Sequence, residues 1–368
     1  MEVRMEKLNH VAVVVTAAVV LGAAFCLSGC KAKNNTVSAA NSADKPEIII
    51  GYAKGSLCLA PLHIAYADGY FEREFKAAGI PYKMEEVDMN QSAELLAAGK
   101  INACVGLTAS LIQPIDNGLD IAFTTGLHTG CTKYFSKADS SIYKPEDLRG
   151  KKIGVPGLAN SATMNIKRKL HDLGFKVNGP DADIQLIPYA QTDLPLALEN
   201  GAVDAIALHD PIAYKAKEQY RFRTIMDTAV DSKFTGEYCC EAYVTTKLAK
   251  ENPEAAAAYT RAIQKAAAFI EAEPEQAAAD QFNGGFCSGD LATNAKLLAS
   301  YNYSPSVSGG KKTFDAASKE LQSFGDLKAD TNAVQFVADH FALLPGVPDS
   351  VTYDKATKQF TNSESDAK

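Results

Sequence analysis

Short apolar runs alternate with helix-forming segments along most of this chain. An apolar run at residues 48–51 predicts a strand, and a helix is predicted to follow over 60–78. A second strand is predicted at 82–87 and a second helix at 92–98. Because strands and helices alternate, the pattern favours a mostly parallel sheet covered by helices. The expected fold class is therefore α/β.

One pattern of a helix end, a glycine and a strand occurs twice. Residues 95–110 read LLAAGKINACVGLTAS, and residues 196–211 read LALENGAVDAIALHDP. In each, a polar turn and an apolar strand follow the glycine. Gly99 and Gly201 suit the position just past a helix, where a left-handed backbone is common. The repetition predicts two similar α/β units.

The N-terminal segment has the pattern of an export signal. Arg4 and Lys7 precede residues 11–27, which read VAVVVTAAVVLGAAFCL without any charge. A basic region, an apolar stretch and small residues before a cut site are typical of a signal peptide. The alternative is an uncleaved transmembrane helix, which takes roughly 20 apolar residues. The sequence Leu27-Ser28-Gly29-Cys30 resembles the bacterial lipobox, and the resemblance implies cleavage before Cys30 and lipid on its thiol.

Length and charge add limits to this picture. The chain has 368 residues, which exceeds the roughly 250 at which single domains usually end. A net charge of −7 gives no indication of nucleic-acid binding, which needs clustered Lys and Arg. Residues 1–29 are expected to be the lipoprotein signal peptide, 30–46 a flexible tether and 354–368 a disordered tail, because the last two are polar.

Four stretches together resemble the solute-binding proteins of bacterial ABC importers. They are PLHIAYADGYF at 61–71, KPEDLRGKKIGVP at 144–156, LENGAVDAIALHDP at 198–211 and NPEAAAAYTRAIQKAAAFI at 252–270. The branch is the one for nitrate, sulfonates, taurine and thiamine precursors. The resemblance implies a two-lobed periplasmic-binding-protein fold of type II, in which two hinge strands join the lobes and one small molecule is held between them.

The resemblance also implies the domain organisation and the partners. Residues 47–125 with 241–353 would form lobe I, and 126–240 would form lobe II with the hinge strands. The chain would be the extracytoplasmic solute-binding subunit of an importer, and would bind a sulfonate, a carboxylate or a heterocycle. It would be a monomer without cofactor or enzymatic activity, held at the membrane by lipid on Cys30, and its partners would be the solute and an ABC permease.

A ligand pocket is expected where strand ends and helix starts of both lobes converge. The candidate ligand-binding residues are Ser56, Leu57, Thr108, Ser110, His128, Thr129, Asn160, Ser161, Thr163, Asp210 and Tyr238. Hydroxyls and free N–H groups at 160–163 could hold an anion, or could only cap a helix. Asp210 could accept a bond from a ligand amine, or cap the helix that starts at Pro211. No arginine falls obviously on a cleft loop, which counts against a strongly anionic ligand held by a bidentate salt bridge.

The resemblance places Cys131 beside the Cys239–Cys240 pair, because the two hinge segments, 121–135 and 238–245, run side by side in the family. With His128, these thiols suit soft or borderline metals. Adjacent cysteines on a strand point to opposite faces, so at most one of the pair shares a face with Cys131. A disulfide is the simplest interpretation; free thiols in the pocket and a metal- or thiol-ligand-binding function remain open.

The cysteine pair also resembles yeast-type thiamine-pyrimidine synthases, which share this fold and carry a cysteine-rich, iron-binding run at this place. This chain has only the CC pair, and GSLCLAPLHIAY at 55–66 stands where a cofactor lysine and histidine would be expected. Enzymatic activity is therefore not expected.

Overall fold

The computed structural model describes residues 47–88 and 91–363, and they contain two five-stranded mixed sheets. The first sheet has the order β2-β1-β3-β10-β4 and the second β7-β6-β8-β5-β9. The strands of the first are β1 Ile48–Tyr52, β2 Tyr82–Glu86, β3 Ala103–Leu107, β4 Ile121–Thr129 and β10 Tyr238–Thr245. Those of the second are β5 Thr132–Ser136, β6 Lys152–Val155, β7 Gln185–Pro188, β8 Ala205–His209 and β9 Arg223–Asp227.

The two sheets share one topology. Around β1 and around β6 the neighbouring strands are parallel. The strand that enters each sheet from the other, β10 or β5, is antiparallel to both of its neighbours. The structure thus confirms the predicted α/β class, the repeated unit and the two-lobed fold.

The repeated glycines end corresponding helices. Helix α3 spans Ser92–Ala97 and α6 spans Leu194–Glu199. Gly99 and Gly201 follow them with φ of 65° and 71°. Only glycine takes such angles without strain, so the chain turns back sharply into β3 and β8.

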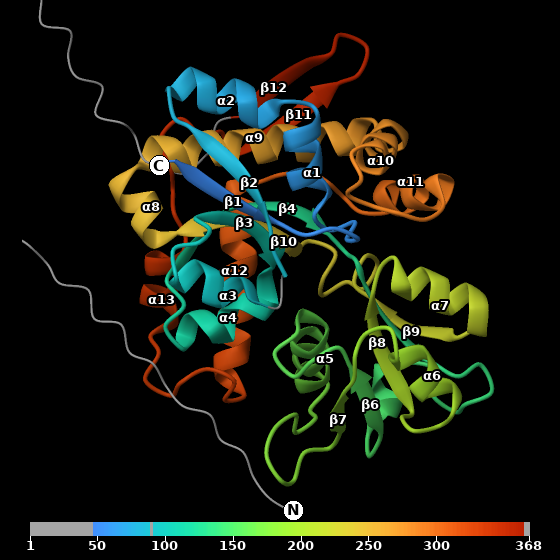
Figure 1. Cartoon of the computed structure of the whole chain (residues 1–368). Helices are drawn as coiled ribbons and strands as arrows, with labels where there is room; N and C mark the ends of the chain where they lie inside the picture. Colours follow the sequence, from blue (N-terminus) through green and yellow to red (C-terminus); the bar gives the residue numbers. More distant parts are fainter. Residues whose placement is uncertain (1–46, 89–90, 364–368) are drawn as a thin grey trace, which may run out of the picture. The chain divides into compact units, whose positions relative to one another are not determined.

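Helices cover both faces of the first sheet (Figure 1). Helices α1 Ala60–Ala67, α2 Tyr70–Ala78 and α9 Pro253–Ala272 lie on one face. Helices α3, α4 Thr108–Asp116 and α12 Val307–Ser323 lie on the other. Asn252 caps α9 through its side chain, and Pro253 occupies the first turn, where its missing N–H costs nothing.

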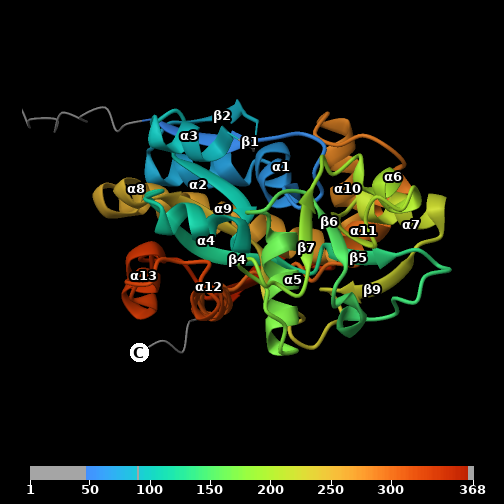
Figure 2. The ribbon, with the colours of Figure 1, turned by 90° about the horizontal axis from the view of Figure 1, so that it is seen from below.

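The second sheet is also covered on both faces, as the side chains of β5 show. Tyr134 packs in the core that includes Ile166 of helix α5 Ser161–Asp172. Phe135 points the opposite way, into the core of α6 and helix α7 Ile212–Tyr220. This alternation is what the two-residue period of a strand requires. Figure 2 shows α5 on one side of this sheet and α6 and α7 on the other.

The chain passes between the sheets at residues 130–131 and 228–237. The predicted boundaries, after residues 125 and 240, fall inside β4 and β10. Four more helices, α8 Thr246–Glu251, α10 Pro274–Asn283, α11 Leu291–Ala299 and α13 Ala333–His340, follow the second crossing, and a short 3₁₀ turn, Pro145–Leu148, precedes β6.

The prediction of a disordered tail from residue 354 is wrong for residues 354–363. Strands β11 Ser350–Asp354 and β12 Gln359–Ser363 form an antiparallel hairpin. Its Phe360 ring packs against Tyr70 and Tyr353, with ring centroids 5.5 and 4.9 Å apart. Two aromatic contacts thus hold a segment that its polar composition alone would leave free.

The predicted signal peptide, Cys30 and the tether lie outside the described residues, as do 364–368. Within the residues that the structure describes, no helix is long and apolar enough to cross a membrane.

Candidate functional site

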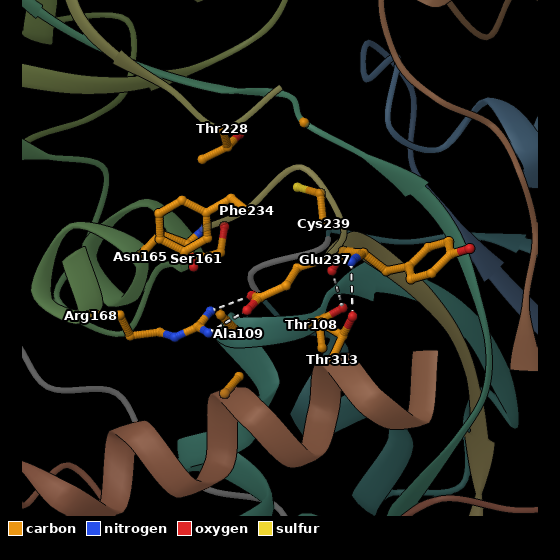
Figure 3. A pocket seen from close by; sticks show the side chains of 13 residues that line it. Thr108, Ala109, Ser161, Asn165, Arg168, Thr228, Phe234, Glu237, Cys239 and Thr313 are labelled. Atoms are coloured by element: carbon orange, nitrogen blue, oxygen red, sulfur yellow. Dashed lines mark hydrogen bonds and ion pairs between the residues drawn. The ribbon is translucent and has the colours of Figure 1, made fainter. Parts of the chain in front are cut away.

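A small pocket lies where helix α5 of the second lobe faces α4 and α12 of the first (Figure 3). Thr108 of α4, Ser161 of α5, Tyr238 of β10 and Thr313 of α12 all line it. Its cavity volume is about 20 Å³, room for about one water molecule. The pocket thus draws on both lobes and on the second crossing.

One face of α5 forms the second lobe's side of the pocket. Ser161, Asn165 and Arg168 line it. They are spaced i, i+4 and i+7, so they share one side of the helix. The Ser161 hydroxyl oxygen is buried and has no hydrogen-bond partner among the described residues. Its backbone N–H donates to Ser110 Oγ at 2.6 Å, which links α5 to α4.

The neighbours of Ser161 serve the helix itself. Asn160 Oδ1 accepts from the Ala162 N–H and from His209 Nε2, each at 2.9 Å. Thr163 Oγ1 donates to the Gly157 carbonyl at 2.6 Å. Neither residue lines the pocket. Asn160 therefore caps the helix, Thr163 bonds back to the preceding loop, and only Ser161 of the three directs a free polar atom to the site.

Arg168 is the main charged group that sequence reasoning missed. Its guanidinium donates two bonds to Glu237, at 2.7 and 2.8 Å, and Nε donates to Glu320 at 2.8 Å. Figure 3 shows the bidentate pair at the edge of the pocket. The expectation concerned arginines on cleft loops. Arg168 lies two turns inside α5 and brings its guanidinium to the pocket from the helix. Its i+7 spacing from Ser161 was the available signal.

The first lobe's side is organised around Thr108. Its hydroxyl lies 3.1 Å from the Tyr238 carbonyl and 3.2 Å from Glu241 Oε1. The Tyr238 N–H donates to Thr313 Oγ1 at 3.0 Å. The Tyr238 phenol donates to the Ser304 carbonyl at 2.6 Å, so its hydroxyl is engaged outside the pocket.

The remaining predicted residues do not line this pocket. Leu57 is buried in the first core, and Ser56 precedes it in the loop after β1. Thr129 pairs with Tyr238 across β4 and β10. Asp210 pairs with Lys133 and accepts the Tyr214 N–H at 3.0 Å, so it caps α7.

Four cysteines and His128 gather beside the pocket. Cys131 and Cys239 Sγ atoms lie 2.8 Å apart, both as free thiols. Cys240 lies instead with Cys58 and His128. The predicted proximity of Cys131 to the pair is confirmed, and the two adjacent cysteines have different partners, as their opposite faces on the strand require. Cys58, in the loop before α1, was missed because nothing in its local sequence indicates this contact.

Sequence comparison assigns the chain to a family. The family described as NMT1/THI5 like matches residues 58–277, more than half of the chain. The chain belongs to the NMT1/THI5-like family. The matched region begins at Cys58 and includes α4, α5 and both crossings, but ends before α12. The comparison with curated proteins found no match.

Solved structures with a similar fold include three bacterial binding proteins. The aliphatic sulphonate binding protein SsuA from Escherichia coli is 18% identical with a TM-score of 0.65, covering 78% of this chain and 96% of that one. SsuA from Xanthomonas axonopodis pv. citri, bound to MOPS, is 17% identical with a TM-score of 0.63, and the match covers 79% of this chain and 98% of that one. The nitrate-binding protein NrtA from Synechocystis PCC 6803 is 14% identical with a TM-score of 0.63, and the match covers 80% of this chain and 86% of that one.

The thiols of this NMT1/THI5-like chain differ in acidity. Hydrogen bonding with Cys131 lowers the pKa of Cys239 to about 6. Burial raises the pKa of the Cys240 thiol well above its ordinary value. Since the thiolate is the reactive and metal-binding form, Cys239 is the more nucleophilic of the two at neutral pH.

Proposed function

We propose that this chain is the extracytoplasmic solute-binding subunit of an ABC importer. It binds one small organic ligand, a sulfonate, carboxylate or heterocycle, between its lobes and delivers it to a membrane permease. The observation that supports this most directly is the buried Ser161 hydroxyl, which has no partner within the described residues and borders a pocket shared by both lobes. A buried hydroxyl without a partner costs about 1–3 kcal/mol, which a ligand oxygen or N–H would recover.

Ligand entry in this proposal requires the lobes to part. A cavity of about 20 Å³ is far smaller than an organic sulfonate. Hinge motion about two crossing segments is the usual way in which such folds admit a ligand. Opening would carry Arg168 on α5 away from Glu237 on the second crossing. A ligand anion could then take the place of the Glu237 carboxylate on the guanidinium.

The first test is native mass spectrometry of the freshly purified full chain in detergent, followed by thermal denaturation with sulfonates, carboxylates, nitrate and pyrimidines. We expect one ligand per chain and a melting temperature that rises with ligand concentration. Ser161→Ala should weaken binding by about tenfold, the loss of one hydrogen bond. Ser140→Ala, in a loop of the same lobe, is the matched control.

Two results would contradict the proposal. One is that no compound changes the melting temperature and no ligand co-purifies. The other is turnover: we propose binding without chemistry, so the ligand should be recovered unchanged. Product formation in the presence of iron would instead favour a pyrimidine-synthase-like enzyme.

We also propose that Cys30 carries lipid and holds the protein at the outer side of a membrane. The Leu27-Ser28-Gly29-Cys30 sequence supports this. Metabolic labelling with an alkyne fatty acid should mark the wild-type chain and fail for Cys30→Ser. Cys26→Ser, four residues earlier, should still be labelled. Equal labelling of both variants would exclude Cys30 as the acceptor.

A further inference from the structure

Two buried cysteines and a histidine converge where three segments of the chain meet. The Sγ atoms of Cys58 and Cys240 and a ring nitrogen of His128 lie within 4.8 Å of one another. Cys58 precedes α1, and His128 and Cys240 are partners across β4 and β10. Zinc takes sulfur at about 2.3 Å and imidazole nitrogen at about 2.0 Å. Three ligand atoms at these separations can therefore surround one cation.

The hydrogen bonding of the histidine leaves one ring nitrogen free to bind a metal. Its Nδ1 lies 3.1 Å from the Thr129 carbonyl, which can only accept, so Nδ1 carries the proton. Nε2 then presents its lone pair, and it is buried with no hydrogen-bond partner among the described residues. The ring is held by Tyr301 and Tyr303, at centroid distances of 5.4 and 4.9 Å. A backbone carbonyl that fixes the other nitrogen is the usual support of a metal-bound histidine.

The group is made of soft ligands, and more of them lie close by. Among the residues that the structure describes, the group contains two thiols and one imidazole and no carboxylate. Cys131 and Cys239, with Sγ atoms 2.8 Å apart, adjoin it, and Cys239 is next to Cys240 in the chain. Thiolates and imidazole select zinc(II) or copper(I) over magnesium or calcium. A fourth, sulfur ligand would complete a tetrahedral site.

We propose that Cys58, His128 and Cys240 bind one soft or borderline metal cation, with Cys131 or Cys239 as the fourth ligand. This site is separate from the solute pocket. Of the four thiols only Cys239 lines that pocket, and Cys58, Cys131 and Cys240 do not. The cation displaces the thiol protons on binding. It joins the loop before α1 to β4 and β10, the strands next to the two crossings.

The test uses the full chain in detergent, purified without chelators, reduced, and titrated with cobalt(II) alone. Cobalt(II) reports thiolate ligands through its charge-transfer absorption, and zinc(II) should displace it. We expect one cobalt per chain. Cys58→Ala and His128→Phe should each weaken cobalt binding at least about tenfold, because losing even a residue that only supports a metal ligand costs this much affinity. Cys287→Ala, a buried thiol outside the group, should bind as the wild type does.

Circular dichroism of each variant keeps the result interpretable. A folded wild-type chain without thiolate absorption would overturn the proposal, and so would unchanged binding in Cys58→Ala. If Cys58→Ala does not fold, His128→Phe decides, because its ring can keep the contacts with Tyr301 and Tyr303. Ser161→Ala should leave cobalt affinity unchanged. A chain that binds cobalt but no organic solute would refute the solute proposal and leave this one standing.

Discussion

Arg168 and Glu237 are joined by two parallel hydrogen bonds of 2.7 and 2.8 Å, and this pair connects α5 to the segment that leads into β10. The Arg168 side chain is 2% exposed, whereas Glu237 is 19% exposed. A buried guanidinium is stable only while its charge is matched by carboxylates. The pair therefore holds the second lobe against the crossing in this conformation.

Removing the Arg168 charge should destabilise the fold. In Arg168→Met the side chain keeps much of its volume, but Glu237 loses its ion pair, and Glu320 keeps only its pair with Lys233. We expect a loss of about 3 kcal/mol in the free energy of unfolding, the lower range for breaking a buried ion pair. Urea unfolding followed by circular dichroism at pH 7 measures it.

Glu320→Gln is the control for this change. It weakens the bond from Arg168 Nε and the ion pair with Lys233, while Glu237 keeps both of its bonds to Arg168. Because Glu320 is partly exposed, we expect a loss of only about 1 kcal/mol. Equal losses in the two variants would show that the bidentate geometry contributes nothing special.

The sequence predicted the fold well because the fold is encoded locally. The glycine turns at Gly99 and Gly201, together with the alternation of strands and helices, are short-range patterns that appear once in each lobe. Their repetition indicated two units before any contact was known. The hairpin at 350–363 was missed because its order comes from Phe360 meeting Tyr70, almost three hundred residues away in sequence.

The site was predicted only in part, for a related reason. Thr108 and Ser161 begin helices and Tyr238 begins a strand, and such termini are natural candidates. Arg168 lies inside a helix, and Cys58 lies in a loop before one, so only tertiary packing gives them their partners. Spacing along α5 could have identified Arg168; no local signal could have identified Cys58.

Glu241 should make stability fall as the pH rises. It is fully buried in β10, Oε2 has no partner among the described residues, and burial raises its pKa well above the ordinary value. Above about pH 4.3 the unfolded chain loses this proton while the folded chain keeps it. The unfolding free energy therefore decreases with pH, by up to about 1.4 kcal/mol per unit, until the folded-state pKa is passed.

Glu241→Gln tests this directly, because the amide is neutral at every pH. Unfolding in urea from pH 5 to pH 9 should show a flatter pH dependence in the variant and a gain in stability at the alkaline end. Glu218→Gln, on the exposed side of α7, should follow the wild type. If the unfolding free energy of Glu241→Gln depended on pH as steeply as that of the wild type, another group would be responsible for the pH dependence.

His63 should have the opposite effect on pH dependence: it should make the protein less stable as the pH falls. Its Nε2 donates to the Ala53 carbonyl at 2.9 Å, and Nδ1 accepts from Gln281 Nε2 at 2.9 Å, so the folded ring is neutral. Burial lowers its pKa to about 4. Between the unfolded value of about 6.5 and 4, only the unfolded chain binds the proton, so up to about 3 kcal/mol of stability is lost as the pH falls.

The variant His63→Gln removes this titration while keeping an amide donor and acceptor. We expect it to be less stable than the wild type at pH 7 and to lose less between pH 6.5 and pH 4, as thermal unfolding in matched buffers would show. His171→Gln, on a half-buried position of α5, serves as the control. A variant with the same acid sensitivity as the wild type would rule out His63 as its source.

Oxidation should link Cys131 to Cys239 and not to Cys240. Their Sγ atoms are 2.8 Å apart, and the Cys239 pKa of about 6 makes it the thiolate at neutral pH. With diamide, the two thiols give up two electrons and two protons, the diazene is reduced to its hydrazine, and one S–S bond forms. Cys240→Ser should still form the linked peptide, and Cys239→Ser should not. Cys104, buried in β3, should remain free in both.

Zinc(II) added before diamide should slow the reaction if Cys131 or Cys239 is the cation's fourth ligand, because a metal-bound thiolate is a poorer nucleophile toward the oxidant. A disulfide that forms equally fast with zinc present would place both thiols outside the metal site.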